Sequence, residues 1–189
     1  DGPDEAILNG LPVPADTAFA ARLTAYLDLF RATPDSGFRV ITHNTIPTAA
    51  GLASSASGYA ALVRALDDLY QWGLPDESLS ILARLGSGSA SRSVAHGFME
   101  WRAGVRDDGM DSFAVPVAAE WPDLVIGLVK ISIAEKDVSS RDAMRRTVET
   151  SALYLAWPGQ VARDLETVRS AIGARDFHQL GRTAENNAL

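Results

Sequence analysis

The feature that most constrains the fold is a stretch of small residues, 47–58, which reads PTAAGLASSASG. It follows a run typical of a β-strand, residues 38–46, and leads into apolar residues at helical spacing. At a helix start several backbone N–H groups lack partners within the helix, and the helix dipole places partial positive charge there. Since few bulky side chains stand in the way, an anion can approach these donors directly. The stretch therefore indicates either a phosphate-binding loop or a helix cap with a small-residue turn, which is the commoner meaning of such a motif alone.

Apolar periodicity predicts the other elements. Helices are expected over residues 15–32 (capped by Asp16 or Thr17), from the end of the small-residue stretch to Gly73, from a cap at Asp76 to Leu85, and over 139–150, 158–172 and 176–189. In the helix that starts at Asp76, we expect three residues to point inward, namely Leu79, Leu82 and Leu85. Strands are expected over residues 97–102, 113–117 and, most clearly, 124–133. This irregular mixture favours a layered α+β or α/β domain.

Composition and charge narrow the class of protein. The chain has 189 residues, enough to bury a core, and it has no cysteine for a disulfide, a thiolate metal site or a thiol nucleophile. No apolar run is long enough to span a bilayer, and the start at Asp1 lacks the order of a signal peptide. We therefore expect a cytoplasmic protein without membrane contact. A net charge of −7 argues against a nucleic-acid surface, so an anionic ligand would need positive charge supplied locally.

Three hydroxyl-rich loops could bind anions. The first is residues 47–58, and the second is residues 86–93 (GSGSASRS), where Arg92 follows three serines. The third is residues 136–141 (KDVSSR), with two further arginines one helical turn later. Serine donors beside arginine suit phosphate and carboxylate groups. The third loop also fits a capped helix with a solvated basic face, because Ser139 and Asp142 have capping-box spacing.

Several other kinds of site are excluded or disfavoured. Residues 86–91 are not a dinucleotide fingerprint, because Ser91 replaces the third glycine and a predicted helix precedes them. No Walker A lysine follows the first loop, and no Gly-x-Ser-x-Gly elbow of a serine hydrolase is present. The three histidines stand apart, which disfavours a histidine-ligated metal.

The three loops together resemble a known family. Residues 44–59 (NTIPTAAGLASSASGY) resemble the phosphate-binding motif of the GHMP kinase superfamily, in the form found in diphosphomevalonate decarboxylases. Residues 86–93 with 97–101, and residues 138–151, are similar to that family's second and third motifs, and residues 7–10 and 185–188 also fit. The resemblance implies an α+β, GHMP-kinase-like two-layer fold. A ribosomal-protein-like, ATP-binding N-terminal part would cover residues 1–116, and the start of a C-terminal α/β domain would cover 117–189.

The resemblance also implies a reaction, the ATP-dependent decarboxylation of mevalonate 5-diphosphate to isopentenyl diphosphate, ADP, phosphate and CO₂. ATP and Mg²⁺ would be the cofactors, and the protein would be a homodimer. The residues expected to hold ATP are Gly51, Leu52, Ala53, Ser54, Ser55 and Ser57, with Ser55 also a metal ligand. Those expected to bind the substrate are Ser87, Ser89, Arg92, Lys136, Ser139, Ser140 and Arg141. Of these, Ser89 and Arg92 would be catalytic, with Arg92 at the carboxylate.

The chain also departs from the family pattern. The family has an upstream segment and a downstream segment that carries the general-base aspartate, and no residue of this chain matches either. We therefore expect the chain to be part of a longer protein and not to turn over alone. Two alternatives stay open. One is a related GHMP enzyme, a kinase or decarboxylase acting on mevalonate or its monophosphate, and the other is a non-catalytic module like the ribosomal domain, which contacts RNA.

Overall fold

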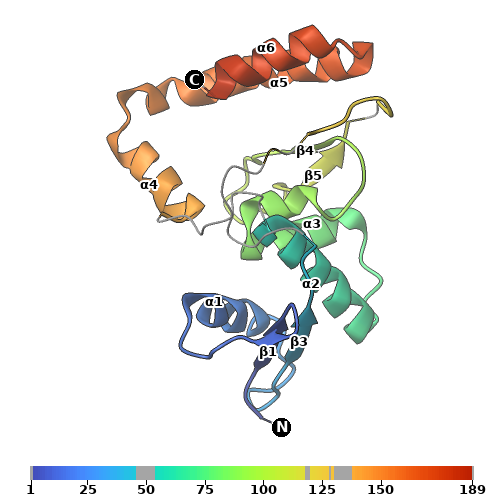
Figure 1. Ribbon diagram of the computed structural model, residues 1–189, viewed down its shortest axis with the longest axis vertical. Helices are drawn as coiled ribbons and strands as arrows, with labels where there is room; N and C mark the ends of the chain where they lie inside the picture. The colour runs from blue at the N-terminus through green and yellow to red at the C-terminus, as the bar shows by residue number, and fades with distance from the viewer. Residues whose placement is uncertain (1, 46–53, 118–119, 128, 130–137, 189) are drawn as a thin grey trace. The chain divides into compact units, whose positions relative to one another are not determined.

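The computed structural model describes residues 2–45, 54–117, 120–127, 129 and 138–188. The chain divides into two compact units, Asp1–Val115 and Pro116–Leu189 (Figure 1). The first unit combines strands with helices, whereas the regular structure described beyond Pro116 in the second unit is helical.

A three-stranded sheet opens the first unit, with strand order β2-β1-β3. β1 (Glu5–Leu8) and β2 (Leu11–Pro12) form an antiparallel hairpin whose two turn residues, Asn9 and Gly10, both have positive φ, as tight hairpins require. β1 pairs in parallel with β3 (Arg39–Thr42), Ile7 lying opposite Ile41. The parallel crossover is α1 (Ala18–Leu27), and Thr17 caps it by accepting a hydrogen bond from Ala20 N at 3.1 Å.

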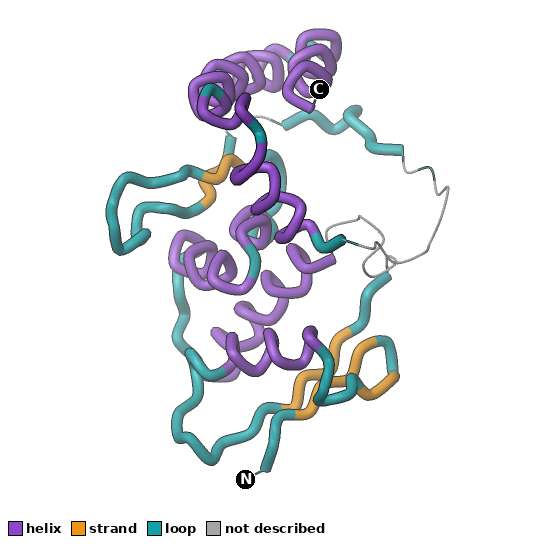
Figure 2. The backbone as a smooth tube through the Cα atoms, turned by 90° about the vertical axis from the view of Figure 1, so that its left-hand side faces the viewer, coloured by secondary structure: helices purple, strands orange, loops and turns teal. Residues whose placement is uncertain are grey.

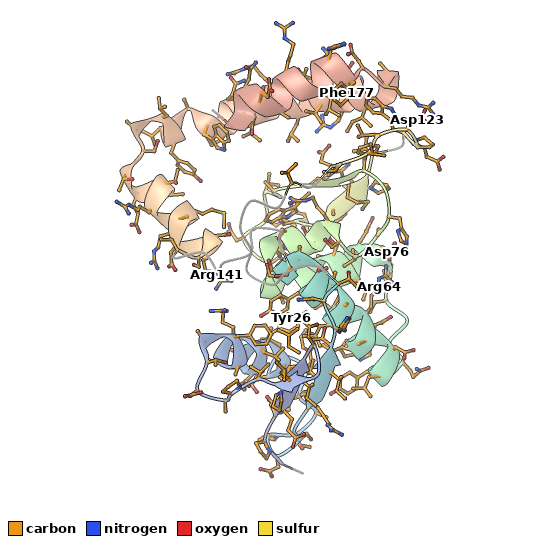
Figure 3. All side chains as sticks on the ribbon, in the orientation of Figure 1. Tyr26, Arg64, Asp76, Asp123, Arg141 and Phe177 are labelled. Carbon is orange, nitrogen blue, oxygen red and sulfur yellow. The ribbon has the colours of Figure 1, made fainter. Side chains whose placement is uncertain are left out.

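Two apolar clusters hold the first unit together. In one, α1 packs its buried face, which includes Tyr26 and Leu27, against Leu66 of α2 (Ser54–Tyr70). The hydroxyl of Tyr26 donates to Leu82 O at 3.0 Å, and burial raises the pKa of that hydroxyl above its usual value (Figure 3). The other cluster joins α2, α3 (Asp76–Gly86) and the short 3₁₀ helix η1 (Gly88–Arg92) through Ala60, Val63, Leu79, Ala83, Ala90 and Val94.

Two expectations for α3 were wrong. Asp76 is the first helical residue, and Pro75 occupies the cap position without a side-chain hydrogen bond. Leu85 is 53% exposed, although Leu79 is buried and Leu82 packs against the same cluster. At 100° per residue, Leu85 lies 240° beyond Leu79 around the helix, so the buried face runs through Ala83 instead.

A two-stranded ribbon, β4 (Met99–Trp101) with β5 (Ala114–Pro116), follows η1. The second unit contains α4 (Ser140–Thr150), the 3₁₀ helix η2 (Ala152–Leu155), α5 (Trp157–Ala174) and α6 (Phe177–Ala188). Figures 1 and 2 both show α5 and α6 side by side. Asn187 Nδ2 donates to Asp164 Oδ2 at 2.7 Å between them, and Arg175 ends α5 in the left-handed conformation.

Two predicted strands differ from the structure. β3 ends at Thr42, so residues 43–45 are not in the strand, while Ile46 lies outside the described residues. In the predicted strand 124–133, residues 124–127 and 129 have no strand structure, and the others lie outside the described residues. The described side chains of Val125, Ile126 and Val129 are more than four-fifths exposed. A strand that is apolar on both faces needs neighbouring strands and covering layers. In the described sheets, no strand pairs with this segment.

Within the described part of the chain, no helix combines the length and apolar character that crossing a bilayer demands.

Candidate functional site

The first hydroxyl-rich loop is described only from Ser54 onward. Ser54 begins α2, and Ser55 and Ser57 lie in its first turn. Gly51, Leu52 and Ala53 lie outside the described residues, as does Lys136 of the third loop. Ser57 Oγ donates to Ser54 O at 3.2 Å, so its hydroxyl proton is used within the helix.

Three serine hydroxyls from the first two loops meet at the start of α2. Ser55 Oγ lies 3.3 Å from Ser87 Oγ, and Ser87 Oγ lies 3.3 Å from Ser89 Oγ. Ser55 is exposed, while the other two are partly buried. Each hydroxyl can donate one hydrogen bond and accept others by rotating, so a row of three can adapt to the oxygens of an anion. The structure thus brings Ser55 together with Ser87, which follows it by 32 residues, and with Ser89 beside Ser87.

Two buried serines, Ser80 and Ser91, hold the backbone of η1 in place through hydrogen bonds. Ser91 is fully buried and its hydroxyl donates to Gly88 O at 2.8 Å. Ser80, also fully buried, donates to Ser91 O at 2.8 Å and accepts from Ala114 N at 2.8 Å. One hydroxyl therefore joins α3, η1 and β5. Sequence reasoning missed Ser80. Its position next to Leu79, near the apolar face of α3, was the available signal that its hydroxyl would be buried and would need a partner.

Arg64 ties α2 to the segment that follows η1. Its Nε donates to Val94 O at 3.0 Å, and its Nη2 donates to Asp76 Oδ1 at 2.8 Å (Figure 3). The ion pair with Asp76 is half exposed and adds little by itself, but the bond to Val94 O satisfies a carbonyl group of a buried residue. α2, α3 and the end of η1 are thus held in one arrangement around the serine row.

Arg92 lies at the end of η1, and its side chain is exposed. Its Cζ lies 5.9 Å from the ring centroid of Trp101 in β4, within the range of a cation–π contact. Among the described residues, no carboxylate forms an ion pair with Arg92. The positive charge of Arg92 is therefore not neutralised by a described acidic side chain. Sequence reasoning included Trp101 in the second motif but assigned it no role.

The third loop lies in the second unit and has a different structure. Ser139 caps α4, because its Oγ accepts from Asp142 N at 3.1 Å. In a capping box the acidic side chain bonds the cap's backbone N–H, whereas here Asp142 Oδ2 accepts from the Ser139 hydroxyl at 2.6 Å. Ser140 opens the helix, Arg141 is exposed, and Arg145 pairs with Asp142 at 2.9 Å. The capped helix considered as the alternative for this loop is thus present.

The donor set can be compared with what Mg²⁺ and ATP need. Among the described residues, no group of three or more histidine, aspartate or glutamate side chains could hold a metal ion. Mg²⁺ commonly keeps water ligands and is bound through phosphate oxygens with one or two protein groups. A serine hydroxyl at a helix start therefore fits a metal ion carried by a nucleotide, and does not fit a metal ion held by protein carboxylates.

Comparison with known proteins identifies the family. Residues 2–114 match the model of the diphosphomevalonate decarboxylase-like N-terminal domain, and residues 125–188 match that of the mevalonate 5-diphosphate decarboxylase C-terminal domain. The chain belongs to the diphosphomevalonate decarboxylase family. It is 41% identical over 191 aligned positions to diphosphomevalonate decarboxylase mvd1 of Aspergillus fumigatus, which covers 92% of this chain and 47% of that protein. It is 43% identical over 141 positions to diphosphomevalonate decarboxylase of Saccharomyces cerevisiae, which covers 73% of this chain and 36% of that protein.

Solved structures of the decarboxylase family share the fold. Mevalonate diphosphate decarboxylase from Staphylococcus aureus superposes with a TM-score of 0.80 at 38% identity, over 98% of this chain and 56% of that one. MDDEF in complex with MVAPP, AMPPCP and magnesium superposes with a TM-score of 0.81 at 40% identity, over 99% and 57%. These matches confirm the predicted α+β fold of the family. The chain spans about half the length of the relatives it matches.

The division at residues 116 and 117, the ligand roles of the serines and arginines, the homodimer and the cytoplasmic location stay predictions.

Proposed function

We propose that the whole native protein catalyses the ATP-dependent decarboxylation of mevalonate 5-diphosphate to isopentenyl diphosphate. Membership of the diphosphomevalonate decarboxylase family supports the reaction. The observation that carries the proposal is the row of hydroxyls formed by Ser55, Ser87 and Ser89, with the exposed Arg92 on the same short helix as Ser89. Hydroxyl donors beside a guanidinium that no described carboxylate neutralises suit a crowded polyanion.

The proposed roles follow the three loops. The loop from Gly51 to Ser57 would hold the phosphates of ATP, with Ser55 also contacting Mg²⁺. Ser87, Ser89 and Arg92 would bind the substrate, Arg92 at its carboxylate. The diphosphate would be bound by Lys136, Ser139, Ser140 and Arg141. Because the Ser139 hydroxyl already caps α4, this end of the helix would contribute mainly its backbone N–H groups and the positive end of the helix dipole.

The decarboxylation needs protein groups that orient the substrate carboxylate and stabilise the charges of the phosphate groups. ATP supplies the phosphoryl group that converts the tertiary hydroxyl of the substrate into a leaving group. When the C–O bond breaks, positive charge develops on carbon, and the electrons of the bond to the carboxyl carbon form the double bond as CO₂ departs. Arg92 would orient the carboxylate for this step, and the serine hydroxyls would stabilise the phosphate oxygens by pre-positioned hydrogen bonds.

Two products test the proposal. The whole native protein is supplied with ATP, Mg²⁺ and mevalonate 5-diphosphate labelled at the carboxyl carbon, and ADP and labelled CO₂ are measured together. Equal amounts of both are expected. ADP without CO₂ would instead indicate a related small-molecule kinase. If neither ADP nor CO₂ forms, and a filter retains RNA with the protein in a salt-sensitive manner, the result would favour a non-catalytic RNA-binding module.

A single substitution tests the ATP-binding role of the first loop. Ser55→Ala removes the exposed hydroxyl at the start of α2, so the dissociation constant for Mg·ATP should rise about fivefold or more. Ser93→Ala removes an exposed hydroxyl just beyond η1 and serves as the matched control, with unchanged affinity. Isothermal titration of both variants provides the measurement, and unchanged affinity for Ser55→Ala would contradict the assignment.

A further inference from the structure

The indole ring of Trp101 contacts both ends of η1. At one end it lies so close to Gly88 that a Cβ added there would meet Trp101 Cη2 at 2.8 Å. At the other end the guanidinium carbon of Arg92 lies 5.9 Å from the centroid of the ring. Gly88 and Arg92 are the first and last residues of η1. The ring therefore spans the short helix that carries Ser89 and Arg92.

The orientation of this ring is fixed by hydrogen bonds. Trp101 Nε1–H donates to Ser112 Oγ at 3.1 Å, and the Ser112 hydroxyl donates to Arg102 O at 3.0 Å. Ser112 is only 5% exposed, and the backbone of Arg102 bonds Phe113 O at 3.0 Å in the β4–β5 ribbon. Rotation of the Trp101 ring would break its hydrogen bond to Ser112, whose hydroxyl is itself oriented by its bond to Arg102 O.

The geometry points to Trp101 as a positioning residue for Arg92, an inference that rests on the function proposed for that arginine. A cation–π contact places the guanidinium over an aromatic ring without pairing it with a carboxylate. An ion pair with a neighbouring carboxylate would occupy N–H groups of the guanidinium. A contact with Trp101 thus restrains a long, flexible side chain while leaving its charge available for the substrate carboxylate.

The chain provides a control tryptophan. Trp72 is 40% exposed against 36% for Trp101, and it stacks on Tyr70 with ring centroids 4.9 Å apart. It lies beyond the C-terminal end of the 17-residue α2, whereas Ser55 lies in the first turn of that helix. At 1.5 Å per residue, the two ends of α2 are about 25 Å apart. Replacing Trp72 therefore removes a similar side chain without touching η1.

A double-mutant cycle in the active native protein tests the inference. Trp101→Leu should lower kcat/KM for mevalonate 5-diphosphate by about five- to tenfold, the size of a moderately shielded cation–π contact, with KM for ATP unchanged. Trp101→Phe keeps an aromatic face and should recover most of this loss. In an Arg92→Ala background, Trp101→Leu should have less than about a twofold further effect, because the group it positions is gone. Trp72→Leu should leave kcat/KM unchanged.

The possible outcomes separate this inference from the proposed function. An equal loss from Trp101→Leu in the presence and absence of Arg92 would overturn the positioning role, while CO₂ release by the parent protein would leave the decarboxylase intact. Wild-type activity in Arg92→Ala would also overturn it, because Arg92 would then have no role to support. Absence of CO₂ release from the parent protein would overturn the proposed function itself. If Trp101→Leu fails to fold, Ser112→Ala, which frees the indole N–H, replaces it in the same cycle and should give a smaller loss in the same direction.

Discussion

Two turns with the same sequence signature, serines followed by an arginine, differ in how the rest of the protein supports them. The turn of residues 86–93 is held by buried Ser80 and Ser91, so the hydroxyls of Ser87 and Ser89 are not needed to maintain the backbone. In the turn before α4, Ser139 itself forms the helix cap. No described residue of α4 is buried.

The difference shows that the availability of a serine hydroxyl to a ligand depends on which groups hold the surrounding backbone in place. Where other residues satisfy the backbone, an exposed serine can turn its hydroxyl toward an anion. Where the serine is itself the cap, a ligand must compete with the helix for that hydroxyl. Composition cannot distinguish these cases, because both turns contain adjacent or alternating serines beside arginine.

The largest expected effect compares the arginines of the two turns. Arg92→Ala should lower kcat of the native protein by about 100-fold or more, because a positioned charged donor is lost. Arg92→Lys should recover little of this, since a point charge replaces a planar fork. Arg141→Ala, at an exposed position in the less supported turn, should cost less than about tenfold. Steady-state kinetics measures all three variants, and equal losses from the two alanine variants would remove the distinction between the turns.

The next effect concerns the support beneath the first turn. Ser80→Ala leaves two buried groups, Ser91 O and Ala114 N, without their hydrogen-bond partner. Each lost hydrogen bond should lower the free energy of unfolding by about 1–3 kcal/mol. Ser93→Ala, at an exposed position next to η1, should change stability by less than about 0.5 kcal/mol. Urea unfolding measures both. A negligible loss for Ser80→Ala would mean that the first turn does not depend on this hydroxyl.

A smaller effect should distinguish the two units by their response to acid. Asp4 pairs with Arg31 at 2.8 Å and accepts from Phe38 N at 2.9 Å, and the hydrogen bond from Arg31 is the main cause that lowers the pKa of Asp4. A lowered native pKa gives stability that is present above the unfolded value, near 3.8, and is lost as pH falls through the native value.

Asp4→Asn should therefore destabilise the first unit at pH 7 and have less effect at pH 3. The control is Glu166→Gln, which removes the carboxylate of an exposed pair with Arg169 in the second unit and should have no measurable effect at either pH. Chemical unfolding at several pH values measures the difference. A pH-independent loss for Asp4→Asn would show that the charge of Asp4 is not the cause.

The smallest effect separates capping from ligand binding at Ser139. Ser139→Ala should destabilise α4 by about 1 kcal/mol, seen as faster amide hydrogen exchange in its first turns. Ser139→Asn keeps a good capping side chain but removes the hydroxyl, so exchange should stay near that of the parent protein. An increase in KM for mevalonate 5-diphosphate with Ser139→Asn would show a direct role for the hydroxyl. Unchanged KM would assign Ser139 to the cap alone.

Much of the fold could be predicted because local pattern dominates helices. The cap at Thr17, one of the two caps expected, and the positions of α2, α5 and α6 follow from apolar periodicity and capping residues. The segment 124–133 could not be settled in this way, because β-structure depends on partners elsewhere in the chain. The inward position expected for Leu85 was wrong because a strict three-residue interval drifts around a helix with 3.6 residues per turn.

The candidate site could be predicted in part, for a similar reason. The sequence indicated Ser55, Ser87, Ser89 and Arg92 as neighbours, and the structure brings the three serines into a row. It did not indicate Ser80 or Ser112, and it included Trp101 in the second motif without a role, because each acts through a contact with a residue distant in sequence or through burial. Their proposed roles become visible only once the tertiary contacts are known.

The bond between Ser80 and Ala114 has a consequence for the order of assembly during synthesis. Ala114 lies 34 residues after Ser80, so the hydroxyl that holds η1 gains its second partner only when β5 has left the ribosome and docked. Long-range contacts of this kind close late, since the intervening loop must first lose its conformational freedom. A nascent chain that ends before β5 should therefore present residues 86–93 without their final support, and ligand recognition by this turn should mature after the helices around it.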